Sequence, residues 1–177
     1  NLSQSDEVAF RAQFDGAVPP PEQLYWRGVV MSQLDGTVWR GLKYFEIPNA
    51  LRREPEVVLA GDPLRYRIIM EPTQQNWVYS LRYARAEKPR LMSLTDFRLY
   101  SPTDVEYRLQ YRVRSWPEAL LEPQLHPWRR SAETRLPPGD NPRARALAEE
   151  LYRRAGSPEA FVTEALAYFR RQPFFYT

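Results

Sequence analysis

An alternating run from Val105 to Arg114 constrains the fold more than any other feature of this chain. Five apolar residues alternate there with five polar ones. The apolar set is Val105, Tyr107, Leu109, Tyr111 and Val113, and the polar set is Glu106, Arg108, Gln110, Arg112 and Arg114. A period of two residues over this length is typical of a β-strand and leaves little room for a helix. Because one face is polar, the sequence predicts an antiparallel sheet with one side in contact with water.

Shorter segments of the first hundred residues indicate further strands. Alternation predicts half-buried strands over residues 7–14 and 64–71. Apolar clusters between prolines and glycines favour strands at 77–83, 91–95 and 97–100, and a strand stub at 42–47. These segments extend the mainly β character of the chain's first part.

The segment from Leu24 to Arg40 carries rings on both sides of an Asp35-Gly36 turn. Residues 24–28 and 37–40 are strand-like, whereas 29–34 fits either a strand or one helical turn. Tyr25, Trp26 and Trp39 are large apolar anchors, so we expect them in the core.

Beyond Ser115 the pattern changes. Residues 116–140 contain five prolines and indicate a linker laid over the surface. Asn141-Pro142 and Ser157-Pro158, each a capping side chain followed by proline, are start signals for two helices, 142–155 and 158–171. Gly156 ends the first helix and Pro173 stops the second. The residues expected on the buried helix faces are Leu147, Leu151, Phe161, Ala165, Leu166 and Phe169.

The predicted fold is therefore α+β: a mainly β, antiparallel, sandwich-like domain followed by two short helices. We place the β domain at 1–135, with its proline-rich linker starting at about 116, and the helices at 136–177. The apolar tail Phe174–Tyr176 predicts a missing packing partner, as in an excised fragment. No stretch reaches the ~20 apolar residues of a membrane span, and no signal peptide is visible.

Composition excludes most standard catalytic apparatus. The 177 residues contain no cysteine, which removes disulfides, thiolate metal sites and a cysteine nucleophile. The single histidine, His126, lacks the Gly-x-Ser-x-Gly turn of a serine hydrolase, and a zinc site normally needs more than one histidine. The seven glycines match no phosphate-binding loop. We therefore predict no catalytic, cofactor-binding or metal-binding residue, and His126 as a loop residue.

Charged side chains offer weaker candidates. Arg108, Arg112 and Arg114 share one strand face, which indicates either a solvated surface or a contact with anionic phospholipid. The tyrosines at 107 and 111 lie on the opposite face, so rings and charges do not interleave as a nucleic-acid surface requires. We expect no nucleic-acid partner.

Neither carboxylates nor tryptophans form an obvious site in the sequence. Glu149 and Glu150 are neighbours on a predicted helix and diverge, while Glu118 and Glu122 sit in the proline-broken segment. Neither pair indicates the facing carboxylates of a glycosidase. A glycan-binding module would instead present Trp26, Trp39 and Trp77 as an exposed row.

Three segments resemble a known family. They are EVAFRAQFDGAVPPPEQLYWRGVVMSQLDGTVWR, YRIIMEPTQQNWVYSL and FVTEALAYFRRQPFFYT. The spacing of Tyr25–Gly28, Asp35-Gly36 and Trp39, together with the ending Gln172–Thr177, is similar to that of bacterial membrane-anchored transglutaminase-like proteins, which are protein-glutamine gamma-glutamyltransferases. The resemblance covers almost the whole chain.

This resemblance implies that membrane helices precede a periplasmic region, which opens with a β domain and continues into a papain-like transglutaminase core. The family's Cys-His-Asp triad would follow Thr177. The implied partners are the chain's own downstream core and membrane helices, and an envelope protein as substrate. The implied location is the periplasmic side of the inner membrane. The alternative is a stand-alone β-sandwich module that binds a partner protein or an envelope polymer.

Overall fold

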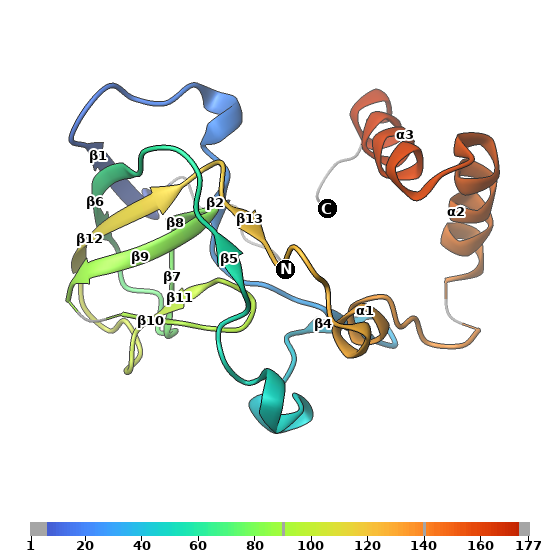
Figure 1. Cartoon of the computed structure of the whole chain (residues 1–177), viewed down its shortest axis with the longest axis horizontal. Helices are drawn as coiled ribbons and strands as arrows, with labels where there is room; N and C mark the ends of the chain where they lie inside the picture. Colours follow the sequence, from blue (N-terminus) through green and yellow to red (C-terminus); the bar gives the residue numbers. More distant parts are fainter. Residues whose placement is uncertain (1–6, 90, 140, 174–177) are drawn as a thin grey trace. The chain divides into compact units, whose positions relative to one another are not determined.

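The computed structural model describes residues 7–89, 91–139 and 141–173 (Figure 1). Contacts within the chain separate two units, one that ends at Arg135 and one that begins at Leu136. We describe each unit by itself. None of the helices in the described ranges is long and apolar enough to cross a membrane.

A four-stranded antiparallel sheet is the centre of the first unit (Figure 1). Its order is β1 (Phe10–Phe14), β6 (Leu64–Met70), β12 (Leu109–Trp116) and β9 (Tyr83–Lys88). Met70 of β6 pairs with Phe10 on one side and with Leu109 on the other. This register puts the apolar residues of neighbouring strands on one face.

Short strands surround this sheet. One three-stranded sheet contains β10 (Met92–Ser93), β11 (Leu99–Tyr100) and β7 (Trp77–Val78). The three two-stranded sheets pair β13 (Leu120–Leu121) with β5 (Val57–Val58), β2 (Trp26–Arg27) with β8 (Ser80–Leu81), and β3 (Gln33–Asp35) with β4 (Val38–Arg40). Three 3-10 turns cover Pro21–Gln23, Tyr44–Glu46 and Asn49–Leu51. The predicted fold class is confirmed.

The core forms where β6 and β12 turn their apolar faces inward. Its fully buried side chains include Tyr66, Ile68, Met70, Val78, Leu81, Leu99, Tyr111 and Val113. The alternation predicted for 64–71 is confirmed, because every second residue of β6 from Tyr66 is buried. The Tyr66 hydroxyl accepts a hydrogen bond from the Leu81 N–H at 2.9 Å and lies 2.6 Å from Ser115 Oγ. A buried polar group is thus satisfied inside the apolar layer.

The alternating run begins its strand later than predicted. β12 starts at Leu109, and Tyr107 is 81% exposed. Val105 is buried, but its backbone bonds a loop: its N–H donates to Gln75 O, and its carbonyl accepts from the N–H groups of Thr73 and Gln74. These loop bonds hold Val105 outside the β6 ladder, so the period-two pattern there does not mark strand pairing.

The aromatic segment 24–40 is only partly core. Trp26 packs against Phe10 with ring centroids 5.0 Å apart, as predicted, but Tyr25 is 75% exposed and Trp39 is 52% exposed. The expectation of a buried anchor was wrong for these two rings. The hairpin of β3 and β4 pairs only with itself among the described strands, so no second layer covers Trp39. Within 29–34, a strand begins at Gln33.

Two further strand predictions need correction. Residues 77–83 do not form one strand, because β7 and β8 are separate and Arg82, at a φ of 28°, precedes β9. Residues 42–47 contain a 3-10 turn in place of a strand stub, since the Glu46 carboxylate accepts the Lys43 N–H at 2.8 Å.

Residues 116–135 are not a surface linker. Trp116 and Ala119 are buried, β13 pairs with β5, and helix α1 (Pro127–Glu133) follows. The Arg82 guanidinium donates to the Ala119 carbonyl at 3.1 Å and holds this segment against the first unit. The prolines punctuate short elements that are packed into the unit.

The second unit contains α2 (Pro142–Ala155) and α3 (Pro158–Arg171), with the predicted bounds. Ser157 Oγ accepts the Ala160 N–H at 3.2 Å, so this cap is confirmed. Asn141 makes no such bond and has a φ of 52°, so its predicted capping role was wrong. Gly156 ends α2 at a φ of 75°, a conformation that favours glycine.

The helix faces are covered only in part. Leu151 is buried, Leu147, Phe161 and Ala165 are half-buried, and Leu166 and Phe169 are 50% and 59% exposed. The predicted burial of Leu166 and Phe169 was therefore wrong. The prediction for Phe174–Tyr176 falls outside the described residues.

Candidate functional site

The basic strand face is an ion-pair network. Arg108 Nη2 lies 3.0 Å from Glu71 Oε1, Arg114 Nε lies 3.0 Å from Glu87 Oε1, and Arg112 Nη1 lies 3.8 Å from Asp15 Oδ2. Each of the three predicted arginines faces a carboxylate from a neighbouring strand or loop. Such exposed pairs contribute little to stability, and they offset the charge that would attract an anionic partner.

His126 is the N-terminal cap of α1. Its Nδ1 accepts a hydrogen bond from the Trp128 N–H at 3.1 Å, and the side chain is exposed. The ring nitrogen thus satisfies one of the free N–H groups at the helix start. This contact gives the only histidine of the chain a structural role.

The four candidate carboxylates do not converge. Glu122 Oε1 lies 2.8 Å from Arg129 Nε, and Glu118 reaches Gly61, where an added Cβ would lie 3.1 Å from its Oε2. On α2, Glu150 lies 3.6 Å from Arg154, and Glu149 lines a separate hollow. Each acid has a local neighbour, and the structure shows no facing pair among them.

The three candidate tryptophans form no exposed row. Trp26 packs edge-on to Tyr66 at 5.6 Å, and Trp77 packs edge-on to Tyr79 at 5.2 Å. Gly28 lies so close to Tyr79 that an added Cβ would sit 3.1 Å from the ring. Trp39 is the one of the three that is exposed.

Sequence reasoning missed a buried cation on α1. The Arg129 side chain is only 6% exposed and lies between Glu122 at 2.8 Å and Glu133 at 3.7 Å. Burial raises the pKa of Glu133, and the Arg129 charge opposes that change. The His126-Pro127 start signal and the four-residue spacing of Arg129 and Glu133 were the signals that could have indicated this helix.

This cluster borders a mixed-charge pocket of about 320 Å³. Residues 42–54, the β10–β11 hairpin and α1 line it, together with Ser32. Its cations are Arg52, Arg98 and Arg129, and its acids are Glu54, Asp96 and Glu133. Arg98 Nε lies 2.9 Å from Asp96 Oδ2, so charges are matched within the wall itself. Among the described residues, no group of three or more acids and histidines is arranged to hold a metal ion.

Exposed rings gather on the segment from Val38 to Arg53, which we call the arm. Exposed fractions are 63% for Val38, 52% for Trp39, 65% for Tyr44 and 72% for Phe45. Lys43 Nζ lies 5.7 Å from the centroid of the Phe45 ring, and the Arg52 guanidinium lies 4.7 Å from that of Tyr44. The arm therefore presents apolar rings with cations beside them.

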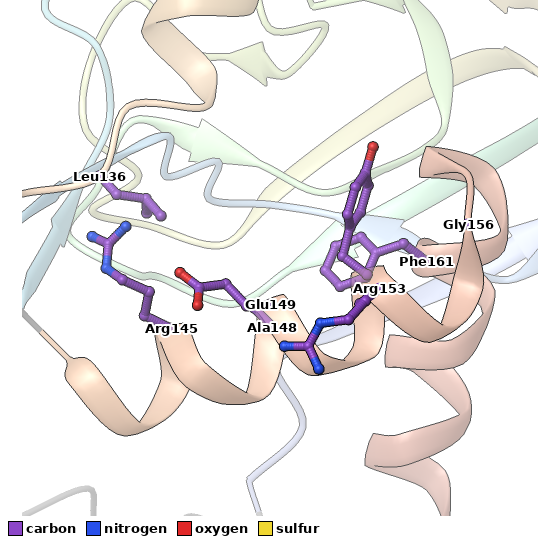
Figure 2. A pocket seen from close by; sticks show the side chains of 8 residues that line it. Leu136, Arg145, Ala148, Glu149, Arg153, Gly156 and Phe161 are labelled. Atoms are coloured by element: carbon purple, nitrogen blue, oxygen red, sulfur yellow. The ribbon is translucent and has the colours of Figure 1, made fainter.

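The second unit has a hollow of about 770 Å³ along α2 and α3 (Figure 2). Figure 2 shows Leu136, Arg145 and Glu149 toward one end of it and Phe161 near Gly156 toward the other. Tyr152, 50% exposed, packs edge-on to Phe161 at 5.6 Å. Most of the exposed lining is apolar, as in a helix pair that has one face without a covering layer.

The chain matches the model of the TgpA N-terminal domain over residues 1–122. It is 42% identical over 176 residues to a protein-glutamine gamma-glutamyltransferase of Pseudomonas aeruginosa, covering 99% of this chain and 26% of that protein. Two crystal structures of the periplasmic domain of TgpA from Pseudomonas aeruginosa, one bound to ethylmercury, match with a TM-score of 0.81. Identities are 40% and 41%, and the matches cover 98% of this chain and 60% and 59% of those chains.

Proposed function

The chain belongs to the TgpA N-terminal domain family, and on this premise we propose that it is the non-catalytic, periplasmic front part of a membrane-anchored transglutaminase-like acyltransferase. The β unit acts as a spacer or docking module between the membrane and the catalytic core. The pair of α2 and α3 begins that core and packs against its remainder.

The reaction of the whole protein needs groups that this chain does not contain. A cysteine thiolate attacks a glutamine carboxamide, ammonia leaves, and the resulting thioester is resolved by an amine or by water. A histidine activates the thiol and an aspartate orients that histidine. These 177 residues contain no cysteine, and the imidazole of His126 caps α1.

One observation carries the proposal: nearly the whole chain, without a cysteine, aligns with about a quarter of a gamma-glutamyltransferase. The exposed apolar side chains of α2 and α3, Tyr152, Val162, Leu166 and Phe169, support a further packing partner for the helix pair.

Amine incorporation tests the proposal. The 177-residue chain is incubated with a glutamine-donor protein and a fluorescent primary amine, beside the longer product of the same gene. We expect labelling and ammonia release from the longer product only, and loss of both when its predicted nucleophilic cysteine is replaced by alanine. Labelling by the 177-residue chain alone would overturn the assignment.

The second candidate is a stand-alone module that binds a partner protein or an envelope polymer. The exposed rings of the arm favour this candidate, because exposed apolar patches of this kind mark contact surfaces. The two candidates predict different coding sequence directly after Thr177. A downstream cysteine followed by histidine and aspartate supports the acyltransferase, whereas a stop codon directly after Thr177 supports the stand-alone module.

A further inference from the structure

We propose that the arm, residues 38–53, is a contact surface for an anionic lipid bilayer. This inference goes beyond the proposed function and does not depend on it, because a stand-alone module could carry the same surface. It rests on three features of the arm: its exposed rings, its excess of positive charge, and the contacts that hold these groups in place.

The rings of the arm suit the boundary between water and lipid. Trp39, Tyr44 and Phe45 are each more than half exposed, although such side chains normally bury most of their surface. Tryptophan and tyrosine concentrate at membrane interfaces, where the apolar ring and its polar tip both find partners. Figure 1 shows the segment after β4 looping out beyond the central sheet of its own unit.

The charge of the arm is complementary to anionic headgroups. The arm contains four basic residues, Arg40, Lys43, Arg52 and Arg53, and one acid, Glu46. Glu46 is matched by Arg40, with oxygen–nitrogen distances of 2.8 Å and 2.9 Å. The next acid, Glu54, lines the mixed-charge pocket and accepts a hydrogen bond from Ser93 Oγ at 3.4 Å. Lys43, Arg52 and Arg53 therefore remain as the excess charge of the arm.

The arm is organised before it meets a partner. The Arg40–Glu46 pair joins β4 to the 3-10 turn that carries Tyr44 and Phe45, and the Arg40 side chain holds the pKa of Glu46 down at about 2. Arg52 Nε donates to the Ile47 carbonyl at 2.8 Å while its guanidinium covers the Tyr44 ring. A surface held in shape in this way loses less entropy when it binds.

The predicted basic face of residues 105–114 is a weaker candidate for the same lipid. Its three arginines each face a carboxylate, whereas Lys43 and Arg52 face rings. The lipid contact that the sequence suggested at Arg108, Arg112 and Arg114 is therefore assigned to the arm.

Vesicle sedimentation tests this inference on the 177-residue chain. The vesicles contain phosphatidylcholine alone or with about one third phosphatidylglycerol, in low and in physiological salt. We expect binding to the anionic vesicles, weakened by salt, and a drop of about fivefold in the partition coefficient for each basic charge removed in Lys43→Gln and Arg53→Gln. Phe45→Ser should also weaken binding, since the ring no longer enters the interface.

Matched controls place the contact within the unit. Tyr107→Ser removes a ring that is 81% exposed outside the arm, and Arg108→Gln removes a charge of the predicted basic face of residues 105–114, so neither should change binding. Quenching by lipids brominated along the acyl chain should act mainly on Trp39, and Trp39→Phe should remove most of the quenching. Equal partition to neutral and anionic vesicles would overturn the proposal. So would binding that Arg108→Gln abolishes and Phe45→Ser does not.

A protein partner gives a different result. Concentration-dependent self-association in sedimentation velocity without vesicles, abolished by Phe45→Ser, would assign the arm to a second copy of the chain and overturn the lipid contact. The amine-incorporation assay uses no vesicles and no arm variants. The lipid contact and the proposed function can therefore fail separately.

Discussion

The two units of this chain bury their side chains in contrasting ways. In the β unit, Tyr66, Ile68 and Met70 of one strand are at most 1% exposed, because the central sheet and the short strands enclose them. In the helix pair, Leu151 is the only buried side chain of α2, and none of α3 is buried. The β unit thus has a closed core of its own, whereas the helix pair depends more on its caps and local hydrogen bonds.

Ion pairs show the same contrast and give the largest expected effect. Arg129→Ala should lower the free energy of unfolding of the β unit by about 3–5 kcal/mol, because it leaves Glu122 partly buried without its cation. Urea unfolding followed by tryptophan fluorescence measures this loss.

Arg154→Ala, which removes an exposed pair on α2, is the matched control and should change the free energy of unfolding of the helix pair by less than about 0.5 kcal/mol. Far-UV circular dichroism follows this variant, because all five tryptophans lie in the β unit. Equal effects of the two substitutions would contradict the contrast in burial between the units.

Apolar truncation comes next. Ile68→Ala in β6 should cost the β unit about 2–5 kcal/mol, since the side chain is fully buried and leaves a cavity. Leu166→Ala on α3, where the side chain is 50% exposed, should be close to neutral. The urea midpoints of the two variants give the ratio of the two losses in stability, provided that the dependence of the free energy of unfolding on urea concentration is the same for both. A large loss for Leu166→Ala would mean that the helix pair already has a covering layer.

A single hydroxyl gives a smaller effect. Tyr66→Phe should cost about 1–3 kcal/mol, because the Leu81 N–H and Ser115 Oγ lose their buried partner. Burial raises the pKa of Tyr66 to about 12, so the group that makes these bonds is the neutral hydroxyl at pH 7. Tyr107→Phe, at an exposed position, should leave thermal unfolding unchanged. A neutral result at both positions would indicate that water replaces the Tyr66 hydroxyl.

The sequence predicted best what is encoded locally. Both bounds of α2 and α3 follow from proline at the start and from Gly156 or Pro173 near the end. The alternation over 64–71 identifies β6, because every second side chain from Tyr66 is buried while β1 and β12 pair along the two edges of the strand. The absence of a catalytic constellation stays a prediction from composition, because the sequence contains no cysteine.

The sequence predicted least where distant segments decide the outcome. Tyr107 and Val105 both belong to the apolar set of the alternating run. Only Val105 is buried, and its backbone bonds the loop at 73–75. Trp39 is of a residue type that is usually buried, but its hairpin pairs with no further strand in the described chain. Arg129 looks like a linker residue in the sequence, but it is buried beside a pocket that residues 42–54 and the β10–β11 hairpin also line. Register, layering and ion pairing between distant residues are not contained in a local pattern.

The two helix start signals, Asn141-Pro142 and Ser157-Pro158, look alike in sequence, and substitutions there have the smallest expected effect on stability. Ser157→Ala should remove the Oγ bond to the Ala160 N–H and lower the stability of α3 by about 1 kcal/mol. Hydrogen exchange should then speed up in the first turn of α3. Asn141→Gly removes a side chain that caps nothing and suits the φ of 52°, so α2 should exchange at an unchanged or slower rate.

Faster exchange in α2 after Asn141→Gly would show that the Asn141 side chain does cap this helix in solution. If hydrogen exchange speeds up only in α3, the two helices begin with different local contacts, although each start is a polar residue followed by proline. This outcome would sharpen the contrast with the β unit, where replacing one exposed residue leaves the enclosed layer intact.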